Sequence, residues 1–476
     1  MTIPGDLPND EFRRAMHEAA DMAADYLEHV VDYPVLPRIA PGDVRAALPA
    51  SPPEAPEPVA ALLADYKRLI EPNVTHWNHP GFMAYFAISG SGPGILGETL
   101  TAALNVNAML WRSGPAPTEL EQTVCDWLRQ LLALPPAFQG HINDTASSSS
   151  MLAIAAARHR AGGTVREQGL AGLPPMTVYC SEQAHSSIDK AMITLGLGLT
   201  FLRKVPVDGE FRLRPDALAQ LIAEDRMAGC IPIAVVATAG TTSVTAVDPI
   251  RAVADIARRE QVWLHVDAAY AGSAAICPEY RALLDGLEEA DSIVVNPHKW
   301  LFTPVDCSVL LLRNPDALRA AFALVPEYLR TTEQGVVNLM DYGPQLGRRF
   351  RALKLWFVIR AFGAEGLRAR IRAHCALARE FADRVRAERG WEVVAPVPFS
   401  TVCFRAVTGE GAADDRLNDA ILAAVNAEGS TFLSATKLHG RTVLRLTIGN
   451  IRTTRAHVAQ AWDVLRAGRR AAGDAR

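Results

Sequence analysis

The sequence predicts an α/β fold in which a mainly parallel sheet is covered by helices on both faces. Apolar, strand-like runs alternate with helical patterns between about residues 92 and 360, and this alternation is typical of parallel sheets. The chain has 476 residues, of which 49% are hydrophobic and 21% charged, as in a globular protein of two or three domains. The predicted strands cover residues 176–180, 200–205, 231–237, 262–267, 292–295 and 308–312.

Residues 1–91 are predicted to form a helical arm. Helices are expected over residues 9–31 and 59–70, and the second ends at Pro72. Residues 33–58 between them hold eight of the 31 prolines, so we expect an extended connector that forms no part of the core. An arm of this kind cannot bury its own apolar face.

Two further domains are expected, a large one over residues 92–360 and a smaller α/β one over residues 361–476. The smaller domain begins with a long helix over residues 367–388 and closes with an arginine-rich helix. Between these helices, strands are predicted over residues 391–394, 401–404 and 442–448.

Composition limits the classes of function. The net charge is −4 and no long basic tract occurs, so neither nucleic acid nor a membrane surface is an expected partner. The seven cysteines are scattered without CxxC spacing, which predicts free thiols in a reducing compartment and no metal site. The first residues lack the regions of a signal peptide, and no apolar run approaches the ~20 residues that span a bilayer. We therefore expect a cytoplasmic protein.

One lysine stands in an unusual context. Lys299 follows the apolar run of residues 292–295 and lies between His298 and Trp300. Lysines are usually solvated, and one held beside aromatic and imidazole groups loses its proton more readily. A neutral amine forms a Schiff base with an aldehyde cofactor. The alternative is an ordinary lysine that extends to solvent or starts a helix.

A carboxylate upstream makes the cofactor hypothesis more specific. Asp267 ends the predicted strand over residues 262–267, and open α/β sheets bind ligands at this end of their strands. Pyridoxal phosphate needs a lysine for its aldehyde and a carboxylate opposite its pyridine nitrogen. Lys299 and Asp267 meet both needs, although aspartate at a strand end also caps helices.

A phosphate site is predicted at the start of a helix. The strand-like residues 140–143 lead into a run of serines, and an alanine-rich helix follows. Free backbone N–H groups and the helix dipole favour an anion there, which makes Ala146 and Ser147 candidate phosphate contacts. Ordinary capping of the helix by its hydroxyl groups is the alternative.

The chain resembles the pyridoxal-phosphate-dependent group II amino-acid decarboxylases of the aromatic-L-amino-acid type, from about residue 10 to the last helix. The resemblance implies fold type I, with a seven-stranded large domain, and a homodimer whose active sites lie at the interface. It also implies that the N-terminal arm packs across the partner subunit. The motifs that carry it are His76-Trp77-Asn78-His79-Pro80, Ala84-Tyr85-Phe86, Thr118-Glu119-Leu120-Glu121, Gln183-Ala184-His185-Ser186-Ser187, the segment of residues 262–272, Asn296-Pro297-His298-Lys299-Trp300 and Leu346-Gly347-Arg348-Arg349-Phe350-Arg351.

The resemblance also implies roles for single residues. His185 would stack on the pyridine ring and contact the substrate, and Ala269 would lie under the ring. Without the resemblance His185 reads as a structural histidine and Thr242 as a turn hydroxyl. Further cofactor contacts are implied for Thr242, Asn296 and His298, and substrate contacts for Tyr85, Phe86, Ile88, Asn107 and Met109.

One position departs from the family's pattern. The family carries a tyrosine seven residues before its Leu-Gly-Arg-Arg-Phe motif, where this chain has Leu339. Leucine cannot donate a proton, so Tyr342, His185 or water would have to protonate the carbon that loses CO₂. The leading hypothesis is decarboxylation of an aromatic L-amino acid through a Lys299 Schiff base. The alternatives are an aldehyde synthase, an aminotransferase of the same fold and a cofactor-binding protein without activity.

Overall fold

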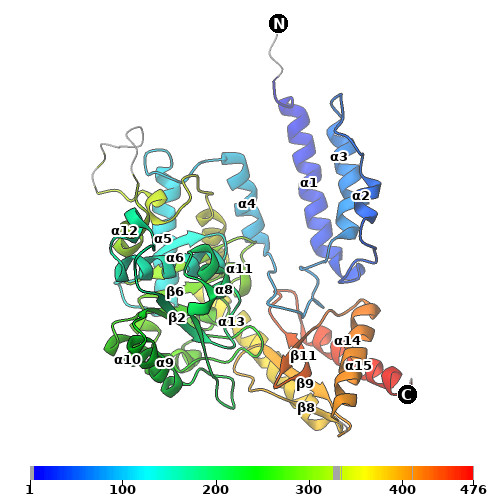
Figure 1. The fold of residues 1–476 in the computed structure, drawn as a ribbon. Coiled ribbons are helices and arrows are strands. Elements are labelled where there is room, and N and C mark those ends of the chain that lie inside the picture. Colours follow the sequence, from blue (N-terminus) through cyan, green and yellow to red (C-terminus); the bar gives the residue numbers. More distant parts are fainter. Residues whose placement is uncertain (1–4, 325–332, 334, 410, 475–476) are drawn as a thin grey trace.

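The structure is a computed structural model that describes residues 5–324, 333, 335–409 and 411–474. It contains a seven-stranded sheet with helices on both faces, a four-stranded sheet and a helical arm (Figure 1). The predicted fold class is confirmed.

The large sheet is parallel over five of its strands. The strands β6, β5, β4, β2 and β3 run in the same direction, whereas β7 is antiparallel to β6 and β1 is antiparallel to β7. All six predicted strands are present, although the one predicted from residue 200 begins with a turn of 3₁₀-helix. In spatial order the strands are β1 (Gln139–Asn143), β7 (Ser308–Leu312), β6 (Ser292–Val295), β5 (Trp263–Asp267), β4 (Ile231–Thr238), β2 (Met176–Ser181) and β3 (Leu202–Val205).

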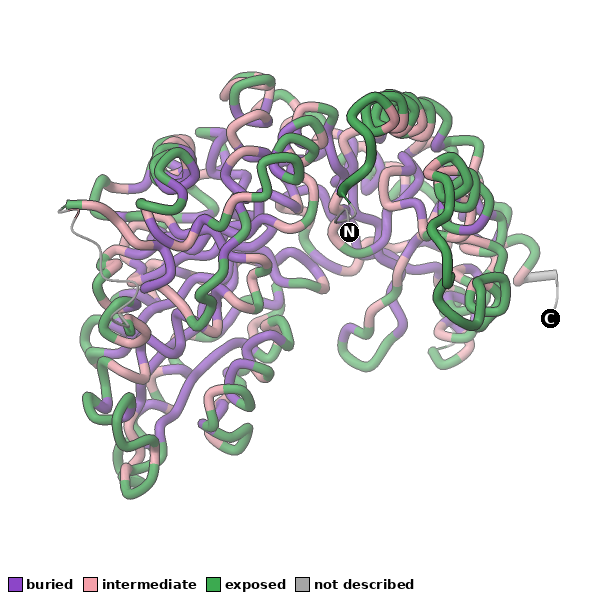
Figure 2. Tube along the Cα trace, turned by 90° about the horizontal axis from the view of Figure 1, so that it is seen from above, coloured by how far each residue is buried: buried purple, intermediate pink, exposed green. Residues whose placement is uncertain are grey.

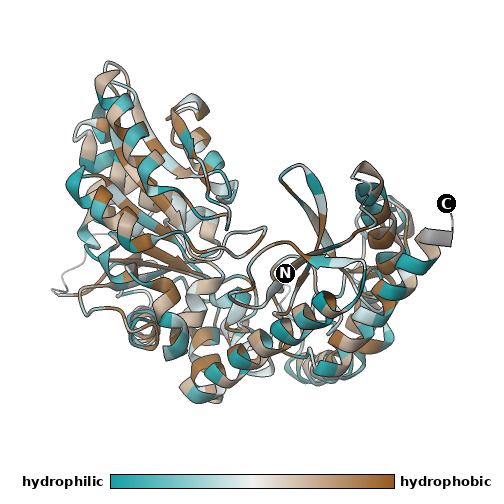
Figure 3. Cartoon of the chain, turned by 90° about the horizontal axis from the view of Figure 1, so that it is seen from below, coloured by the Kyte–Doolittle hydropathy of each residue, from teal (hydrophilic) through white to brown (hydrophobic). Residues whose placement is uncertain are grey.

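Both faces of this sheet are buried, which explains why its strands read as continuous apolar runs. Along β4, Val235 and Ala237 join the hydrophobic cluster on one face, and Ala234 and Val236 join the cluster on the other. Figure 3 shows the strands in the brown of apolar residues. The first face is covered by α5 (Pro115–Leu131), α9 (Pro215–Met227) and α10 (Ile250–Arg259), and the second by α6 (Ala146–Ala161), α8 (Ser187–Thr194) and α12 (Asp316–Phe322).

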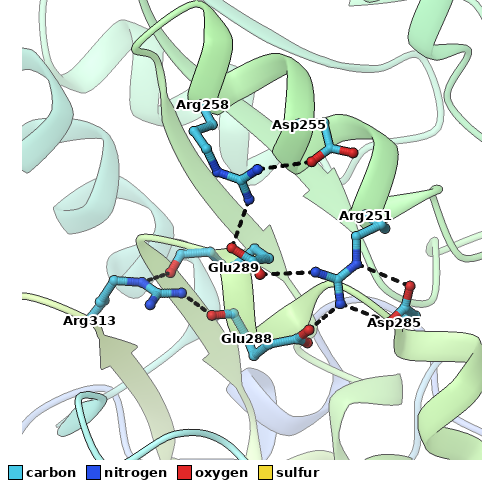
Figure 4. Close-up of polar contacts among 8 residues, drawn as sticks. Arg251, Asp255, Arg258, Asp285, Glu288, Glu289 and Arg313 are labelled. Atoms are coloured by element: carbon cyan, nitrogen blue, oxygen red, sulfur yellow. Dashed lines mark hydrogen bonds and ion pairs between the residues drawn. The ribbon is translucent and has the colours of Figure 1, made fainter.

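An ion-pair network joins α10 to the segment of residues 285–289, which leads into β6 (Figure 4). Arg251 of α10 pairs with Asp285, Glu288 and Glu289, and Arg258 also pairs with Glu289. Arg313, directly after β7, donates to backbone carbonyls of the same turn. Open α/β sheets bind ligands at the edge where the parallel strands end, which here is the edge where β5 and β6 end.

The long helix α13 (Ala352–Ala387) begins well before the predicted residue 367 and joins the two sheets. Its first part packs against α4 (Gly92–Leu104) and α5, and its later part packs against β8 and β9. Gly363 breaks it with φ 60° and ψ 173°, a backbone conformation that is essentially restricted to glycine. This glycine interrupts the apolar pattern of the helix, so the sequence predicted only the part of α13 that follows it.

The small sheet is antiparallel and larger than predicted. Its order is β10 (Ser434–Leu438), β11 (Arg441–Thr447), β9 (Thr401–Ala406) and β8 (Trp391–Val393). The edge strand β10 was not predicted, because only alternate residues of it are sheltered and its exposed side carries Ala435 and Lys437. The helix α14 (Ala412–Glu428) was also missed, and it covers the sheet together with α15 (Arg455–Asp474).

The arm consists of α1 (Asn9–His29), α2 (Asp43–Ala47) and α3 (Val59–Asp65). It lies above the small sheet in Figure 1. Two expectations for the connector were wrong. The connector contains α2, which begins at Asp43, and the Asp43 carboxylate accepts the Ala40 N–H. Val35 of the connector is buried, and its backbone bonds to residues 76 and 429. None of the three helices has a buried residue, and Figure 2 shows the arm mostly in green.

Candidate active site

Lys299 and Asp267 meet at the edge where the parallel strands end. Asp267 is the last residue of β5, and it pairs with Val294 of the adjacent β6. The short helix α11 (Pro297–Trp300) follows β6 and carries Lys299. The Asn296 N–H donates to the Ala269 carbonyl at 3.0 Å, which ties the two strand ends together.

Lys299 lies in a desolvated setting with one carboxylate and one guanidinium nearby. Burial lowers the pKa of Lys299, the charge of Asp267 opposes this change, and Arg445 adds to it. The Lys299 Nζ lies 5.2 Å from the centroid of the Phe86 ring, and the Arg445 guanidinium carbon lies 4.7 Å from the same centroid. The neutral amine is therefore easier to form than in a solvated lysine.

Asp267 and His185 lie within electrostatic reach of Lys299. Asp267 is buried, and its Oδ1 accepts the Ala269 N–H at 3.2 Å. His185 lies in the turn between β2 and α8, and its Nδ1 accepts the Ser187 N–H at 3.1 Å. Its side chain is exposed, yet surrounding protein desolvates the ring and lowers the pKa of His185, while Asp267 raises it and Lys299 lowers it further.

The helix α6 starts after β1, which ends at the same edge of the sheet as β6. The Thr145 Oγ1 caps the helix by accepting the Ser148 N–H, and the N–H groups of Ala146 and Ser147 have no acceptor within the helix. Ser147 is exposed and Ala146 is half-buried. Thr242, in the turn after β4, is also exposed. His298 is buried, its Nδ1 accepts the Cys307 N–H, and burial lowers its pKa to about 3.

Three candidate substrate contacts come from one segment. Tyr85 has a φ of 51°, and the residue is 52% exposed. Phe86 and Ile88 are half-buried. The Arg445 guanidinium donates to the Tyr85 carbonyl at 2.8 Å, so this segment lies next to the lysine.

Four other candidates form a second group. Asn107 Oδ1 accepts the Arg348 N–H, and the Met109 carbonyl accepts the Met340 N–H. Leu339 is buried, and Tyr342 stacks on His141 with ring centroids 5.4 Å apart. Among the residues that the structure describes, none of the ring or charge contacts of Tyr342 involves Lys299. Within one chain, the contacts given above tie this group to Arg348, Met340 and His141.

Three residues of the region were not singled out from the sequence. Arg445 is a buried arginine of β11, and this strand also contains Arg441, Thr442 and Thr447, so the charge of Arg445 does not stand out in the sequence. Tyr270 is buried against Phe86. His265 is buried in β5, where it bonds to the hydroxyls of Ser150 and Ser292, and burial lowers its pKa to about 4. Nothing in the local pattern distinguishes Tyr270 or His265 from core residues.

The residues present fit pyridoxal phosphate. The amine of lowered pKa suits an aldehyde, the carboxylate at the end of β5 suits a ring nitrogen, and the start of α6 suits a phosphate. The Asn296 Oδ1 is buried and has no hydrogen-bond partner among the described residues, so an additional group is needed to satisfy it.

Comparisons with known proteins agree with this chemistry. Residues 41–407 match the family model described as the pyridoxal-dependent decarboxylase conserved domain. The chain belongs to the pyridoxal-dependent decarboxylase family. It is 41% identical to tyrosine decarboxylase 4 of Petroselinum crispum over 96% of this chain and 93% of that protein, and 40% identical to phenylacetaldehyde synthase of Arabidopsis thaliana over 96% of each. The crystal structure of Oryza sativa TDC with PLP and tryptamine superposes with a TM-score of 0.95, at 38% identity over 98% of this chain and 99% of that one.

The protein is thus a pyridoxal-phosphate-dependent amino-acid decarboxylase of fold type I. When bound, the cofactor supplies an electron sink for the bond that breaks at the amino-acid Cα. Across the part of the chain that the structure describes, no helix has the length and apolar character required to span a membrane.

Proposed function

We propose that this enzyme converts an aromatic L-amino acid to its amine and CO₂. The observation that carries the proposal is the pairing of Lys299 and Asp267 at adjacent strand ends, beside aromatic side chains. The exposed Tyr85 ring belongs to an aromatic group, with Trp77 at 6.0 Å and Phe432 at 5.8 Å. The relatives named as tyrosine decarboxylases support an aromatic substrate.

The residues have distinct tasks in this proposal. Lys299 holds the cofactor's aldehyde carbon through Nζ, and Asp267 keeps a proton on the pyridine nitrogen. His185 orients the ring and the substrate, and Ala269 leaves room beneath the ring. The phosphate is held by Ala146 and Ser147 at the start of α6. Further cofactor contacts are assigned to Thr242, Asn296 and His298, and substrate contacts to Tyr85, Phe86, Ile88, Asn107 and Met109.

The test combines a substrate panel with two variants. Purified enzyme is offered a set of amino acids, and CO₂, amine and peroxide are measured together. Lys299→Ala should lose the imine absorbance and turnover. Asp267→Asn should keep the fold and the imine but lose at least about a hundredfold in kcat, since an amide cannot keep the ring nitrogen protonated. A reducible imine at another lysine, or near wild-type kcat in Asp267→Asn, would overturn the assignments.

A second candidate outcome is an aldehyde in place of the amine. The observation in its favour is Leu339, which stands where the resembling decarboxylases carry a proton-donating tyrosine. The phenylacetaldehyde synthase among the relatives supports it. If no group protonates the carbon that loses CO₂, reaction with oxygen and water would give an aldehyde, ammonia and hydrogen peroxide.

We also propose a homodimer with each active site built from two chains. On α4, Leu96, Leu100 and Leu104 repeat every four residues and are 61%, 50% and 62% exposed, so one apolar face lacks a cover in a single chain. The chain continues from this helix to Asn107 and Met109, whose hydrogen bonds among the described residues do not involve Lys299. An isologous interface would carry them to the lysine of the partner subunit.

Three further expectations from the sequence are kept as proposals. The domain divisions after residues 91 and 360 are supported by the helical arm and by the break at Gly363 in α13. A cytoplasmic location is supported by seven free cysteines, of which six are buried. Tyr342 is kept as a candidate proton donor from the partner subunit.

A further inference from the structure

Three aromatic rings form a buried stack that ends at the candidate active site. The Phe86 and Tyr270 rings lie 3.9 Å apart with an interplanar angle of 12°, and the Tyr270 and Trp300 rings lie 4.6 Å apart at 7°. Near-parallel stacking of three rings leaves little freedom to tilt any one of them. Trp300 is also the residue directly after Lys299, so the stack begins and ends beside this lysine.

Polar contacts fix the inner part of the stack. The Tyr270 hydroxyl bonds to the Ser400 hydroxyl at 2.5 Å, and the Trp300 Nε1–H donates to His374 Nδ1 at 3.0 Å. Tyr270 and Trp300 are both almost fully buried. The outer ring, Phe86, therefore rests on a rigid base.

The outer face of Phe86 is shared by two cations. Tyr270 covers one face of the ring, so only the other is open to Lys299 Nζ at 5.2 Å and to the Arg445 guanidinium at 4.7 Å. Arg445 is held in place when it donates to the carbonyls of Tyr85 and Ser243. Its Nη2 is buried and has no hydrogen-bond partner among the described residues, so its charge is poorly neutralised.

We propose that Tyr270 and Trp300 are positioning residues, which hold Phe86 flat so that Arg445 and Lys299 face each other across one ring surface. The inference rests on the proposed role of Lys299 as the cofactor lysine. The guanidinium charge over the same ring face disfavours the protonated lysine, and burial acts in the same direction. The attraction of the ring for an ammonium, about 0.5–2 kcal/mol, opposes both effects.

Other charged groups around Lys299 set the background for this effect. Asp267 from β5 favours the protonated lysine, while His185 from the turn before α8 and His298 from α11 are close enough to interact with it. None of them changes in the variants proposed below. A change in the protonation of Lys299 in those variants is therefore assigned to Arg445 or to the stack.

The experiment measures the protonation of Lys299 in two ways. In the holoenzyme, the imine absorbance is titrated with pH. In the cofactor-free full chain, Lys299 is labelled with limiting acetic anhydride at several pH values and quantified by peptide mass spectrometry. Arg445→Gln should reduce the neutral amine about tenfold at a fixed pH, equal to one pKa unit. Arg445→Lys keeps the charge and should change it much less.

Tyr270 separates positioning from simple packing. Tyr270→Leu removes the supporting ring and should shift Lys299 in the same direction as Arg445→Gln, whereas Tyr270→Phe keeps the ring and should stay near wild type. Combined with Arg445→Gln, Tyr270→Leu should add little, because both changes remove one interaction. If Tyr270→Leu fails to fold, Tyr270→Met serves in its place.

Several results would overturn the inference. It fails if Arg445→Gln leaves the titration of Lys299 unchanged, or if the soluble Tyr270 variant titrates as wild type while Arg445→Gln shifts. Borohydride reduction of the holoenzyme locates the imine separately. An imine at another lysine would refute the proposed function, whereas labelling of the cofactor-free chain would still report on the stack.

Discussion

Buried aspartates in this enzyme differ in their surroundings. Asp248 is enclosed by protein, and its two carboxylate oxygens accept the N–H groups of Leu213 and Thr238 at 2.8 and 2.7 Å. Burial raises the pKa of Asp248 to about 7. Asp267 receives the Ala269 N–H on Oδ1 at the ligand-binding edge of the sheet. The first bonding pattern serves the fold, and the second leaves the carboxylate beside the candidate cofactor site.

The identity of residue 339 is expected to influence the product. Leu339→Tyr introduces a phenol at the position that usually donates the proton, and general acids contribute about 10²–10⁴-fold. We expect a higher ratio of amine to aldehyde and less peroxide, measured by chromatography and oxygen uptake on the best substrate.

Tyr342→Phe is the matched control for this change. In the structure Tyr342 stacks on His141, and Tyr342→Phe keeps this ring while it removes the hydroxyl of the second candidate donor. A large loss of amine in Tyr342→Phe would assign the proton to Tyr342. Unchanged ratios in both variants would point to His185 or water.

At the scale of elements, one buried ion pair joins three parts of the chain. Arg348 Nη2 donates to Glu121 Oε1 of α5 at 2.9 Å and to the Ile142 carbonyl of β1 at 2.7 Å. The Ile142 N–H donates to the same carboxylate at 2.9 Å. Two of the family's motifs therefore serve architecture in this enzyme, since they hold the segment after Leu339 against the edge of the sheet.

Loss of one partner should be costly. Arg348→Met leaves the Glu121 carboxylate buried without its cation, which costs about 3–5 kcal/mol in the free energy of unfolding. Urea unfolding followed by fluorescence measures this loss. Glu121→Gln with Arg348→Met should cost clearly less than the sum of the two single changes.

The exposed network of Figure 4 provides the comparison. Glu289→Gln removes an acceptor of Arg251 and Arg258 at a partly exposed site and should cost less than about 1 kcal/mol. Equal losses at the two sites would contradict the structural role given to the Glu121–Arg348 pair.

The whole molecule contains several buried neutral histidines. Burial lowers the pKa of His79, His265 and His374 to about 4 in each case. Unfolded, each would titrate near 6.5, so between pH 6.5 and 4 the unfolded chain binds more protons than the native one. Their contribution to stability is present above pH 6.5 and is lost as the pH falls through this range.

The three histidines should therefore make stability decrease on acidification through this range, while Asp248, whose pKa is raised to about 7, takes up its proton in the native state and opposes the effect of one of them. Each of these histidines contributes about 1.4 kcal/mol per pH unit within the window. Calorimetric melting between pH 7.5 and 4.5 measures the slope. His374→Gln retains an acceptor for the Trp300 N–H without titrating, and the slope should drop by about one proton; an unchanged slope would contradict the assignment.

Assembly of the site from two chains is tested with hybrids. Lys299→Ala damages one contribution to a site, and Asn107→Trp blocks the other. When the two inactive proteins are mixed, unfolded and refolded together, half of the dimers are hybrids with one intact site, so about a quarter of wild-type activity should return. Each variant refolded alone is the control, and no recovery on mixing would place both contributions in the same chain.

Much of the fold could be predicted because both faces of the large sheet are buried. Its central strands are largely apolar, and Asp267 and Lys299 were located because one ends such a strand and the other follows one. The edge strand β10 escaped because its polar, half-exposed pattern resembles a loop. Arg445 and Tyr270 escaped because they meet the Phe86 ring beside Lys299 only in the folded chain. No local pattern records which buried arginine or tyrosine will lie there.

The break at Gly363 has a consequence for the tolerance of the active site to error. Lys299 is fastened to the large sheet and Arg445 to the small one, while α13 spans both. The backbone of Gly363 sets the direction in which α13 continues from the large sheet to the small one. A residue with a side chain could not adopt this φ and ψ without strain, so a substitution there would redirect the helix that links the elements carrying Lys299 and Arg445.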